Sequence, residues 1–289
     1  MSGYFDAAMY VILSAVAFVF LDKLCSHVDP VTALFVMSGI ALISFNLLCI
    51  KQLVKTYLAC IKNKLLFLLM SLALGVDWLC LTYGTYLSDP FITMVALFVT
   101  VAFLGFVKLY FTNCALSNLL GMLLLLFSVV VLYSTYQIKE AHHIVYGLIL
   151  GTISGLAFFI YIILSDKLSK AGDLSTVQLL ATRFWVLFIG SFFFLSFDDV
   201  YPVIQENMVP LILISFGGLI IPIFFNQQAI KKLGPARSAI LISFVPSVTY
   251  FFDSWYNHNY ILENLVVCIL ITSALVLPKI FLNPQKNFE

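Results

Sequence analysis

Long apolar runs alternate with short polar breaks along the whole of this 289-residue chain. A helix needs about 20 apolar residues to cross the hydrocarbon core of a membrane, and unpaired backbone groups are not tolerated there. The pattern therefore predicts an all-α polytopic membrane protein with ten transmembrane helices. We place these helices near residues 6–21, 31–50, 65–86, 91–108, 118–135, 144–164, 176–197, 208–228, 237–255 and 262–281.

The polar breaks also predict the orientation of the helices, because short cytoplasmic loops retain Lys and Arg. With a cytoplasmic N-terminus, most of the cations fall on the cytoplasmic side, and we expect both termini there. The cytoplasmic cations are Lys51, Lys55, Lys62, Lys64, Lys108, Lys167, Lys170, Lys231, Lys232, Arg237, Lys279 and Lys286. Lys23 and Lys139 fall outside, and Arg183 lies within a predicted helix.

The two halves of the chain share a pattern of small and charged residues. The matched segments are Ser14 to Phe18 with Ser154 to Phe158, Asp22 to Leu24 with Asp166 to Leu168, and Leu87 to Pro90 with Leu233 to Ala236. We therefore expect two repeats of five helices each, covering residues 1–137 and 138–289. An odd number of crossings inserts the second copy from the opposite face, and inverted repeats of this kind support alternating access around a central site.

Composition narrows the classes of function. Hydrophobic residues make up 62% of the chain and charged residues 10%, which leaves no segment for a separate soluble domain. The net charge of +1 and the scattered cations do not suit a nucleic-acid partner. The expected surroundings are therefore the lipid bilayer, and the expected partner is a small-molecule solute.

The second half carries the most specific motif. Asn226-Gln-Gln-Ala-Ile-Lys-Lys-Leu-Gly-Pro-Ala-Arg-Ser-Ala239, followed by Pro246, resembles the signature of the EamA-type carriers of the drug/metabolite transporter superfamily. Ser154 to Lys170 is similar to that family's sixth helix and the loop after it. The resemblance implies a secondary carrier in the plasma membrane, which is the inner membrane in a bacterium. The family's peripheral fifth and tenth helices leave room for a homodimer without requiring one.

The chain also departs from the family pattern. Members carry a Gly-Glu after the fourth and ninth helices, where this chain has Thr112 or Asn113 and Asn259. The proline of the fourth helix is absent, and the Arg of the second helix is replaced near Ser38. The resemblance therefore implies a carrier without naming its cargo.

Asp77 and Arg183 are the candidate charged groups. Asp77 lies about 12 residues into the third predicted helix, roughly 18 Å deep at 1.5 Å per residue. A carboxylate at that depth is a cation or proton site, or a neutral, hydrogen-bonded acid that holds helices together. Arg183 lies close enough to the cytoplasm to reach lipid headgroups, or it contacts the solute. If both face one cavity, Asp77 suits an ammonium and Arg183 a carboxylate.

Proline-interrupted helices supply further substrate-binding candidates. Pro222 and Pro246 each remove a backbone hydrogen bond, which frees carbonyl groups to line a cavity. The polar residues within one or two turns of them are Asn226, Ser243, Ser247 and Tyr250, and these either line the cavity or join helices to one another. Trp78 and Tyr161 either stack on a planar solute or pack against neighbouring helices.

No motif for an enzyme, a cofactor or a metal is present. The chain has no HExxH, GxSxG or nucleotide-binding loop, and Asp77 has no second intramembrane aspartate beside it. His142 and His143 form a pair in a solvated loop, for which we expect no metal. We expect a non-ATP transporter that exports amino acids or related metabolites. The alternatives are uptake of a nucleotide-like metabolite, and a membrane receptor or scaffold that transports nothing.

Overall fold

The computed structural model describes residues 2–25, 28–113, 116–136, 141–195, 197–258 and 260–281, and this part of the chain is helical without a strand. The first half forms α1 (Gly3–Cys25), α2 (Pro30–Leu48), η1 (Ile50–Gln52), α3 (Leu53–Lys62), α4 (Lys64–Leu87), α5 (Pro90–Asn113) and α6 (Leu116–Tyr136). The second half forms α7 (Ala141–Ala171), α8 (Thr176–Arg183), α9 (Trp185–Phe193), α10 (Phe197–Ile214), η2 (Ser215–Ile220), α11 (Ile221–Leu233), α12 (Pro235–Ile242), α13 (Val245–Asn257) and α14 (Leu262–Phe281).

Eight helical stretches of the described chain are long and apolar enough to cross a membrane. They are Gly3–Leu21, Pro30–Leu48, Lys64–Leu87, Pro90–Thr112, Leu116–Tyr136, His143–Ala171, Thr176–Phe193 and Ile204–Leu233. The all-helical, multi-pass character expected from the sequence is therefore confirmed. The ninth predicted helix is divided between α12 and α13, and α14 contains the shorter apolar stretch Leu262–Leu277.

Residues at the helix ends explain where several helices begin. Asp29 precedes α2, and one of its carboxylate oxygens accepts hydrogen bonds from the backbone N–H groups of Val31 at 3.0 Å and Thr32 at 3.1 Å. Ser175 and Gln178 form a reciprocal capping box at the start of α8. Because the first N–H groups of a helix have no partner within it, these side chains fix the point at which each helix begins.

The polar break at residues 51–64 contains a helix that the sequence analysis did not predict. Thr56 and Cys60 are buried on one face of α3, which otherwise presents a largely exposed surface with several lysines. Residues four apart lie on the same side of a helix, so Thr56 and Cys60 mark the side of α3 that packs against its neighbours, where Leu53 and Ala59 also contact the core. The break is therefore a helix rather than a loop.

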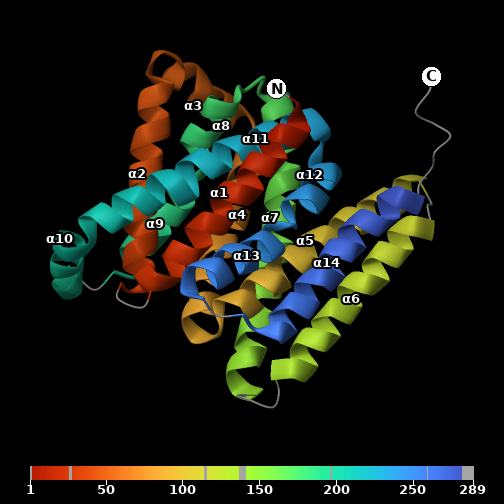
Figure 1. The fold of residues 1–289 in the computed structure, drawn as a ribbon. Helices are drawn as coiled ribbons and strands as arrows, with labels where there is room; N and C mark the ends of the chain where they lie inside the picture. Colours follow the sequence, from red (N-terminus) through yellow and green to blue (C-terminus); the bar gives the residue numbers. More distant parts are fainter. Residues whose placement is uncertain are drawn as a thin grey trace.

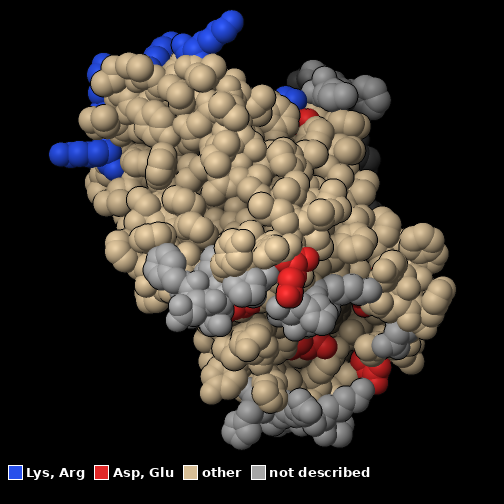
Figure 2. Space-filling model, turned by 90° about the vertical axis from the view of Figure 1, so that its left-hand side faces the viewer, with Lys and Arg blue, Asp and Glu red and all other residues tan. Residues whose placement is uncertain are grey.

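The helices form one bundle with an outer pair (Figure 1). α6 and α14 pack side by side at the edge of the bundle, while α1 packs against α11 and α4 packs against α7 nearer its middle. The start of α1 and the end of α14 lie at the same end of the molecule. On the face in Figure 2, Lys and Arg gather at the upper end, and most Asp and Glu atoms lie lower. Of the lysines used to predict the orientation, the side chains of Lys23, Lys139, Lys279 and Lys286 are outside the described residues.

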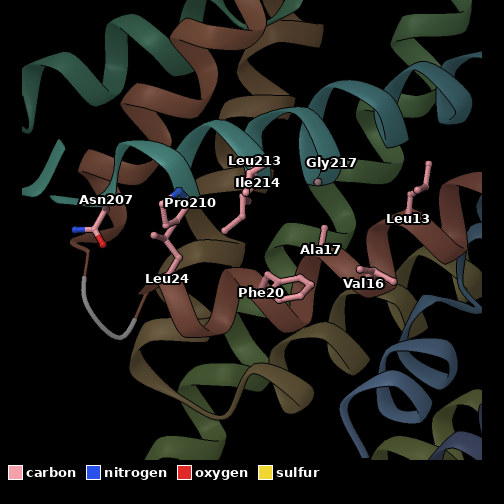
Figure 3. Close-up of a pocket in the computed structure, with 11 residues that line it drawn as sticks. Leu13, Val16, Ala17, Phe20, Leu24, Asn207, Pro210, Leu213, Ile214 and Gly217 are labelled. Atoms are coloured by element: carbon pink, nitrogen blue, oxygen red, sulfur yellow. The ribbon is translucent and has the colours of Figure 1, made fainter. Parts of the chain in front are cut away.

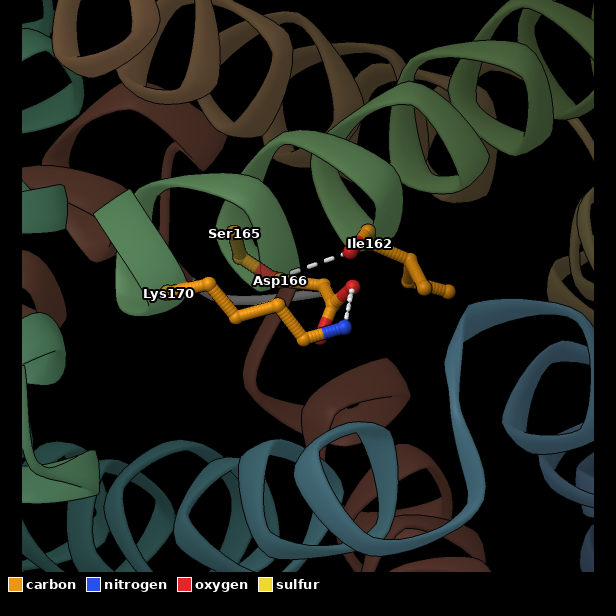
Figure 4. A network of polar contacts seen from close by, with 4 residues as sticks. All are labelled: Ile162, Ser165, Asp166 and Lys170. Carbon is orange, nitrogen blue, oxygen red and sulfur yellow. Dashed lines mark hydrogen bonds and ion pairs between the residues drawn. The ribbon is translucent and has the colours of Figure 1, made fainter. Parts of the chain in front are cut away.

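Two ion pairs lie near helix ends. The Lys232 ammonium is 2.6 Å from a carboxylate oxygen of Asp6, which is buried, and this pair joins α11 to α1. Lys170 and Asp166 form a pair at 2.7 Å within the last turns of α7, where Ser165 also donates a hydrogen bond to the carbonyl of Ile162 (Figure 4). Lys170 is exposed, and exposed pairs contribute little to stability. The Asp6–Lys232 contact is therefore the more consequential of the two.

Candidate functional site

A small cavity lies at the centre of the bundle, between the two halves of the chain. Its walls come from α1, α4 and α5 of the first half and from α7, α8, η2 and α11 of the second. The polar residues that line it are Tyr10, Ser14, Asp77, Tyr161, Arg183 and Asn226. Its volume is about 30 Å³. Since a single water needs about 10–15 Å³ on this measure, the cavity has room for about two waters and not for an amino acid.

Asp77 is buried at the cavity with one side-chain partner from the other half of the chain. It is 4% exposed, and one of its carboxylate oxygens accepts a hydrogen bond of 2.6 Å from the Ser154 hydroxyl on α7. No ion pair joins Asp77 to Arg183, although both line the same cavity. A buried carboxylate with a single hydroxyl donor keeps most of its capacity to accept hydrogen bonds or to bind a cation.

Arg183 is fully buried, so it does not extend toward lipid headgroups. Its Nη1 donates a hydrogen bond to the Tyr161 hydroxyl, and its guanidinium carbon lies 4.6 Å from the ring centre of Phe184 and 5.3 Å from that of Tyr161. Its Nε and Nη2 have no hydrogen-bond partner. Two unpaired donors on a guanidinium are the arrangement that binds a carboxylate through two parallel hydrogen bonds.

Two neighbouring amides lie on α11, where Asn226 lines the cavity and Gln227 follows it in the chain. The Tyr161 hydroxyl donates a hydrogen bond of 3.1 Å to Gln227, whose amide nitrogen has no partner. Neither amide atom of Asn226 is bonded, and this side chain is 1% exposed. Buried polar atoms usually have partners, so this concentration of unbonded ones needs an explanation. We call Asp77, Ser154, Tyr161, Arg183, Asn226 and Gln227 the central cluster.

Interruptions in two helices shape the cavity wall. α8 ends at Arg183 and α9 begins at Trp185, so the arginine lies at a break within the seventh predicted helix. The π-helical turn η2 ends just before Pro222, whose ring would clash with the carbonyl of residue 218 in a regular α-helix. The wider π-helical turn relieves this clash, and Gly218 within the turn lines the cavity.

The structure brings only some of the predicted site residues together. Asp77, Trp78, Tyr161, Arg183 and Asn226 line the cavity. Ser243, Ser247 and Tyr250 do not, although the sequence analysis grouped them with these residues. Their hydroxyls donate to the backbone carbonyls of Ala239 at 2.7 Å, Cys268 at 3.3 Å and Ile261 at 2.8 Å, respectively. Pro246 lies in the first turn of α13, just after the break between the end of α12 at Ile242 and the start of α13 at Val245.

Sequence reasoning did not propose Ser14, Ser154 or Gln227 as site residues. The signal for two of them was present, because Ser14 and Ser154 begin the matched segments of the two halves. The ends of these segments, Phe18 and Phe158, also line the cavity. A polar residue that recurs at matched positions of the two halves was therefore a usable signal for helix faces near the cavity.

Near the paired histidines, His143 Nδ1 lies 3.1 Å from the Leu87 carbonyl, and the side chain of His142 is outside the described residues. The described residues contain no group of three or more His, Cys, Asp or Glu side chains placed to hold a metal ion.

No family model matches the sequence, and no curated protein matches it. Among solved structures, one described only as "Crystal structure of protein" is similar, with a TM-score of 0.67 and 16% sequence identity. The similarity covers 95% of this chain and 96% of the other. At this identity the similarity establishes a shared fold over nearly the whole length of both chains.

Proposed function

We propose that this chain is a secondary transporter that moves small, carboxylate-bearing metabolites across a membrane by alternating access, with amino acid export as the first candidate. The observation that carries the proposal is the pair of unsatisfied Arg183 donors in the same enclosed cavity as the Asp77 carboxylate. A buried charge costs several kcal/mol unless something compensates it. A solute with a carboxylate would offset the cost of burying the Arg183 charge for as long as the solute stays bound.

An arrangement of ten helices in two inverted five-helix repeats belongs to this proposal, and helix packing supports it. If α1 corresponds to α7 and α4 to the α10–α11 segment, the α1–α11 contact is equivalent to the α7–α4 contact, and both contacts join one half of the chain to the other. The α5–α7 contact then corresponds to the contacts of α1 with α12 and α13, and α5–α6 corresponds to α13–α14. The α6–α14 and α2–α9 contacts each join a helix to its expected counterpart in the other half, so they would lie on the two-fold axis that relates the halves. Such pairing is what an in-plane two-fold relation would produce.

The chemistry of the cluster favours a zwitterion. Arg183 presents two donors suited to a carboxylate, Asp77 presents an acceptor suited to an ammonium, and the Asn226 amide can serve either group. The EamA-like signature lies on α11 and α12 and includes Asn226. The proposed EamA-type membership therefore agrees with the position of the cavity.

The size of the cavity suits a closed state of such a carrier. At about 30 Å³ it cannot admit an amino acid, so helices must separate before a solute binds. The Asp6–Lys232 pair joins α1 to α11 beyond one end of the cavity. With the cation-rich end of Figure 2 in the cytoplasm, as we propose, this contact closes the cytoplasmic side. Opening toward that side would require the pair to separate.

Transport by purified protein in liposomes tests the proposal. We would measure counterflow with a labelled amino acid, competed by that amino acid, by its carboxylic acid without the amine, and by its amine without the carboxylate. Arg183→Lys should weaken competition by the two carboxylates about tenfold to hundredfold, because the paired hydrogen bonds are lost. Asp77→Asn should weaken competition by the two amines and leave the bare carboxylic acid unaffected.

Ser243→Ala is the matched control, because Ser243 is buried, does not line the cavity, and donates a hydrogen bond to the carbonyl of Ala239 in α12. It should behave as the unmodified protein. Competition that is the same in all four proteins would refute the assignment of the cavity as the solute site. The absence of counterflow with any amino acid or other carboxylate would refute the transporter proposal itself.

A further inference from the structure

A second, larger space lies beside the central cavity, on the flank of the bundle. It is a groove of about 570 Å³ between α1 on one side and α10 and η2 on the other. In Figure 3, Phe20 and Ala17 of α1 face Ile214 and Gly217 across this space. Along α1 it extends from Leu13 to Leu24, which is roughly 16 Å at 1.5 Å per residue. The groove is therefore long, narrow and almost entirely apolar.

The groove and the cavity share a wall at η2. Gly218 lines both, and a Cβ added there would lie 2.7 Å from the Cβ of Ala17. On α1, Ser14 and Phe18 face the cavity while Leu13 and Ala17 face the groove. The two spaces thus meet where a glycine and an alanine are in contact and where η2 departs from regular helical geometry. π-turns of this kind occur frequently at functional sites.

The two spaces differ in what they can hold. The cavity offers charged and polar groups in about 30 Å³, whereas the groove offers about 570 Å³ and apolar walls. The polar groups that would bind a solute headgroup line the first space, and the adjacent second space has room for the body of the solute. A compact polar solute would have no use for the groove, but a polar head with a linear apolar chain matches both spaces.

We propose that the groove binds the apolar chain of the transported solute, so that the carrier selects amphipathic carboxylates or amino acids with linear apolar chains. Once α1 and η2 separate at the contact of Ala17 with Gly218, the head lies at Arg183, and the chain passes Gly218 and extends along α1 toward Phe20. This inference rests on the proposed function, because it places the head in the central cavity. The groove would add a preference for solutes with a linear apolar chain, which the polar residues of the cavity do not impose.

Gly217→Leu tests the groove with little disturbance of packing. Gly217 lines the groove, and a Cβ added at this position meets no atom within 4 Å. Gly190 on α9 is the matched control, because a Cβ added there also meets nothing within 4 Å and the residue lies outside the groove. The probes are glycine, norvaline, norleucine and α-aminooctanoate, with affinity measured in liposomes of a single lipid composition. Partition of the probes into lipid is then equal for every variant.

In the unmodified protein and in Gly190→Leu, each added methylene should tighten binding up to about fourfold, the gain from burying one CH₂ group. In Gly217→Leu this gain should largely disappear while glycine binds as before. Gly217→Ala, a smaller change that suits a helix, should give an intermediate result and serves if the leucine variant does not fold.

Equal dependence on chain length in the unmodified protein, Gly217→Leu and Gly217→Ala would overturn the inference, and it is also the result expected if a bilayer lipid fills the groove. If Arg183→Lys weakens every probe while both Gly217 variants change none, the groove assignment fails and the proposed function stands. If Arg183→Lys changes nothing, the head has been misplaced and the assignment of the cavity as the solute site fails. Failure of the unmodified protein to bind any of the probes would overturn the groove assignment, and the counterflow assay with other carboxylates would then decide the proposed function.

Discussion

The central cluster and the polar side chains of α12 and α13 look alike in sequence but differ in the structure. Both place polar residues in apolar helices, and each includes residues within two turns of a proline, as Asn226 lies near Pro222 and Ser247 beside Pro246. In the cluster, Arg183 and Asn226 keep unbonded polar atoms beside a cavity. In the second region, which we call the α13 stripe and define as Ser243, Ser247 and Tyr250, every hydroxyl donates to a backbone carbonyl.

The difference separates two uses of polar groups in a membrane. A hydroxyl that bonds a neighbouring carbonyl joins helices, and it needs no ligand. The unbonded Nε and Nη2 of Arg183 and the unbonded amide of Asn226 join no helices to one another, and a ligand that pairs with them would account for their burial beside a cavity. Buried single hydroxyls without partners, such as those of Ser238 and Thr249, do not line the cavity and carry no such implication.

The largest effect is expected from Arg183→Met. Solute affinity should fall about a hundredfold, because a charge-assisted pair of hydrogen bonds is lost. The free energy of unfolding should stay the same or rise, since removing a buried charge that lacks a protein counterion can be stabilising. Thermal unfolding of the purified protein, with and without an amino acid at high concentration, measures both quantities.

A fall in the unfolding temperature of Arg183→Met without ligand would contradict this reading of the cluster. It would mean that the single hydrogen bond to Tyr161 and the contact with Phe184 stabilise the fold more than desolvation of the guanidinium costs. Arg183 would then resemble the α13 stripe, and the contrast between the two regions would disappear.

A smaller effect is expected when the same substitution is made at two asparagines. Asn226 has no bonded side-chain atom, whereas Asn46 donates to the carbonyls of Leu42 at 2.7 Å and Ala181 at 3.0 Å and accepts from Tyr57 at 2.9 Å. Asn226→Leu should weaken solute binding about tenfold with no loss of stability. Asn46→Leu should lower the free energy of unfolding by about 1–3 kcal/mol and leave solute affinity unchanged.

The two variants would be compared by thermal unfolding and by ligand titration in one detergent. Loss of stability in Asn226→Leu without loss of affinity would assign that amide to packing. Similar behaviour of both variants would show that hydrogen-bond satisfaction does not distinguish the site from the rest of the bundle.

Much of the helical layout was predictable from the sequence. Apolar runs separated by Asp29-Pro30, Asp89-Pro90 and similar breaks gave the positions of the helices, because backbone groups in lipid have no alternative to helical pairing. The interruption at Phe184, the π-turn at η2 and the short helix α3 were not predicted. Each of these three features depends on which helices lie next to the segment. The hydropathy of a sequence does not show which helices are neighbours. The count of ten crossings and their inverted relation stay predictions.

For the candidate site, the most informative signal in the sequence was the scarcity of charged residues in the apolar runs. Charged residues are rare in the apolar runs, so Asp77 and Arg183 could be singled out from the sequence, and the structure places both at one cavity. Proximity to a proline was less informative, since it selected Asn226 together with the α13 stripe. Helical periodicity tells which residues share a face, but it does not tell which neighbour that face meets.

The smallest effect is expected from removing one hydroxyl in each region. Tyr250→Phe loses the 2.8 Å hydrogen bond to the Ile261 carbonyl, and interhelical hydrogen bonds in membranes average about 0.6 kcal/mol. The unfolding free energy should fall by about that amount, with transport unchanged. Tyr161→Phe removes the same group from the central cluster, where it accepts from Arg183 and donates to Gln227, so its main effect should be weaker solute binding. Because the chemical change is identical, a transport defect in Tyr250→Phe equal to that in Tyr161→Phe would show that the α13 stripe also contacts the solute during the transport cycle.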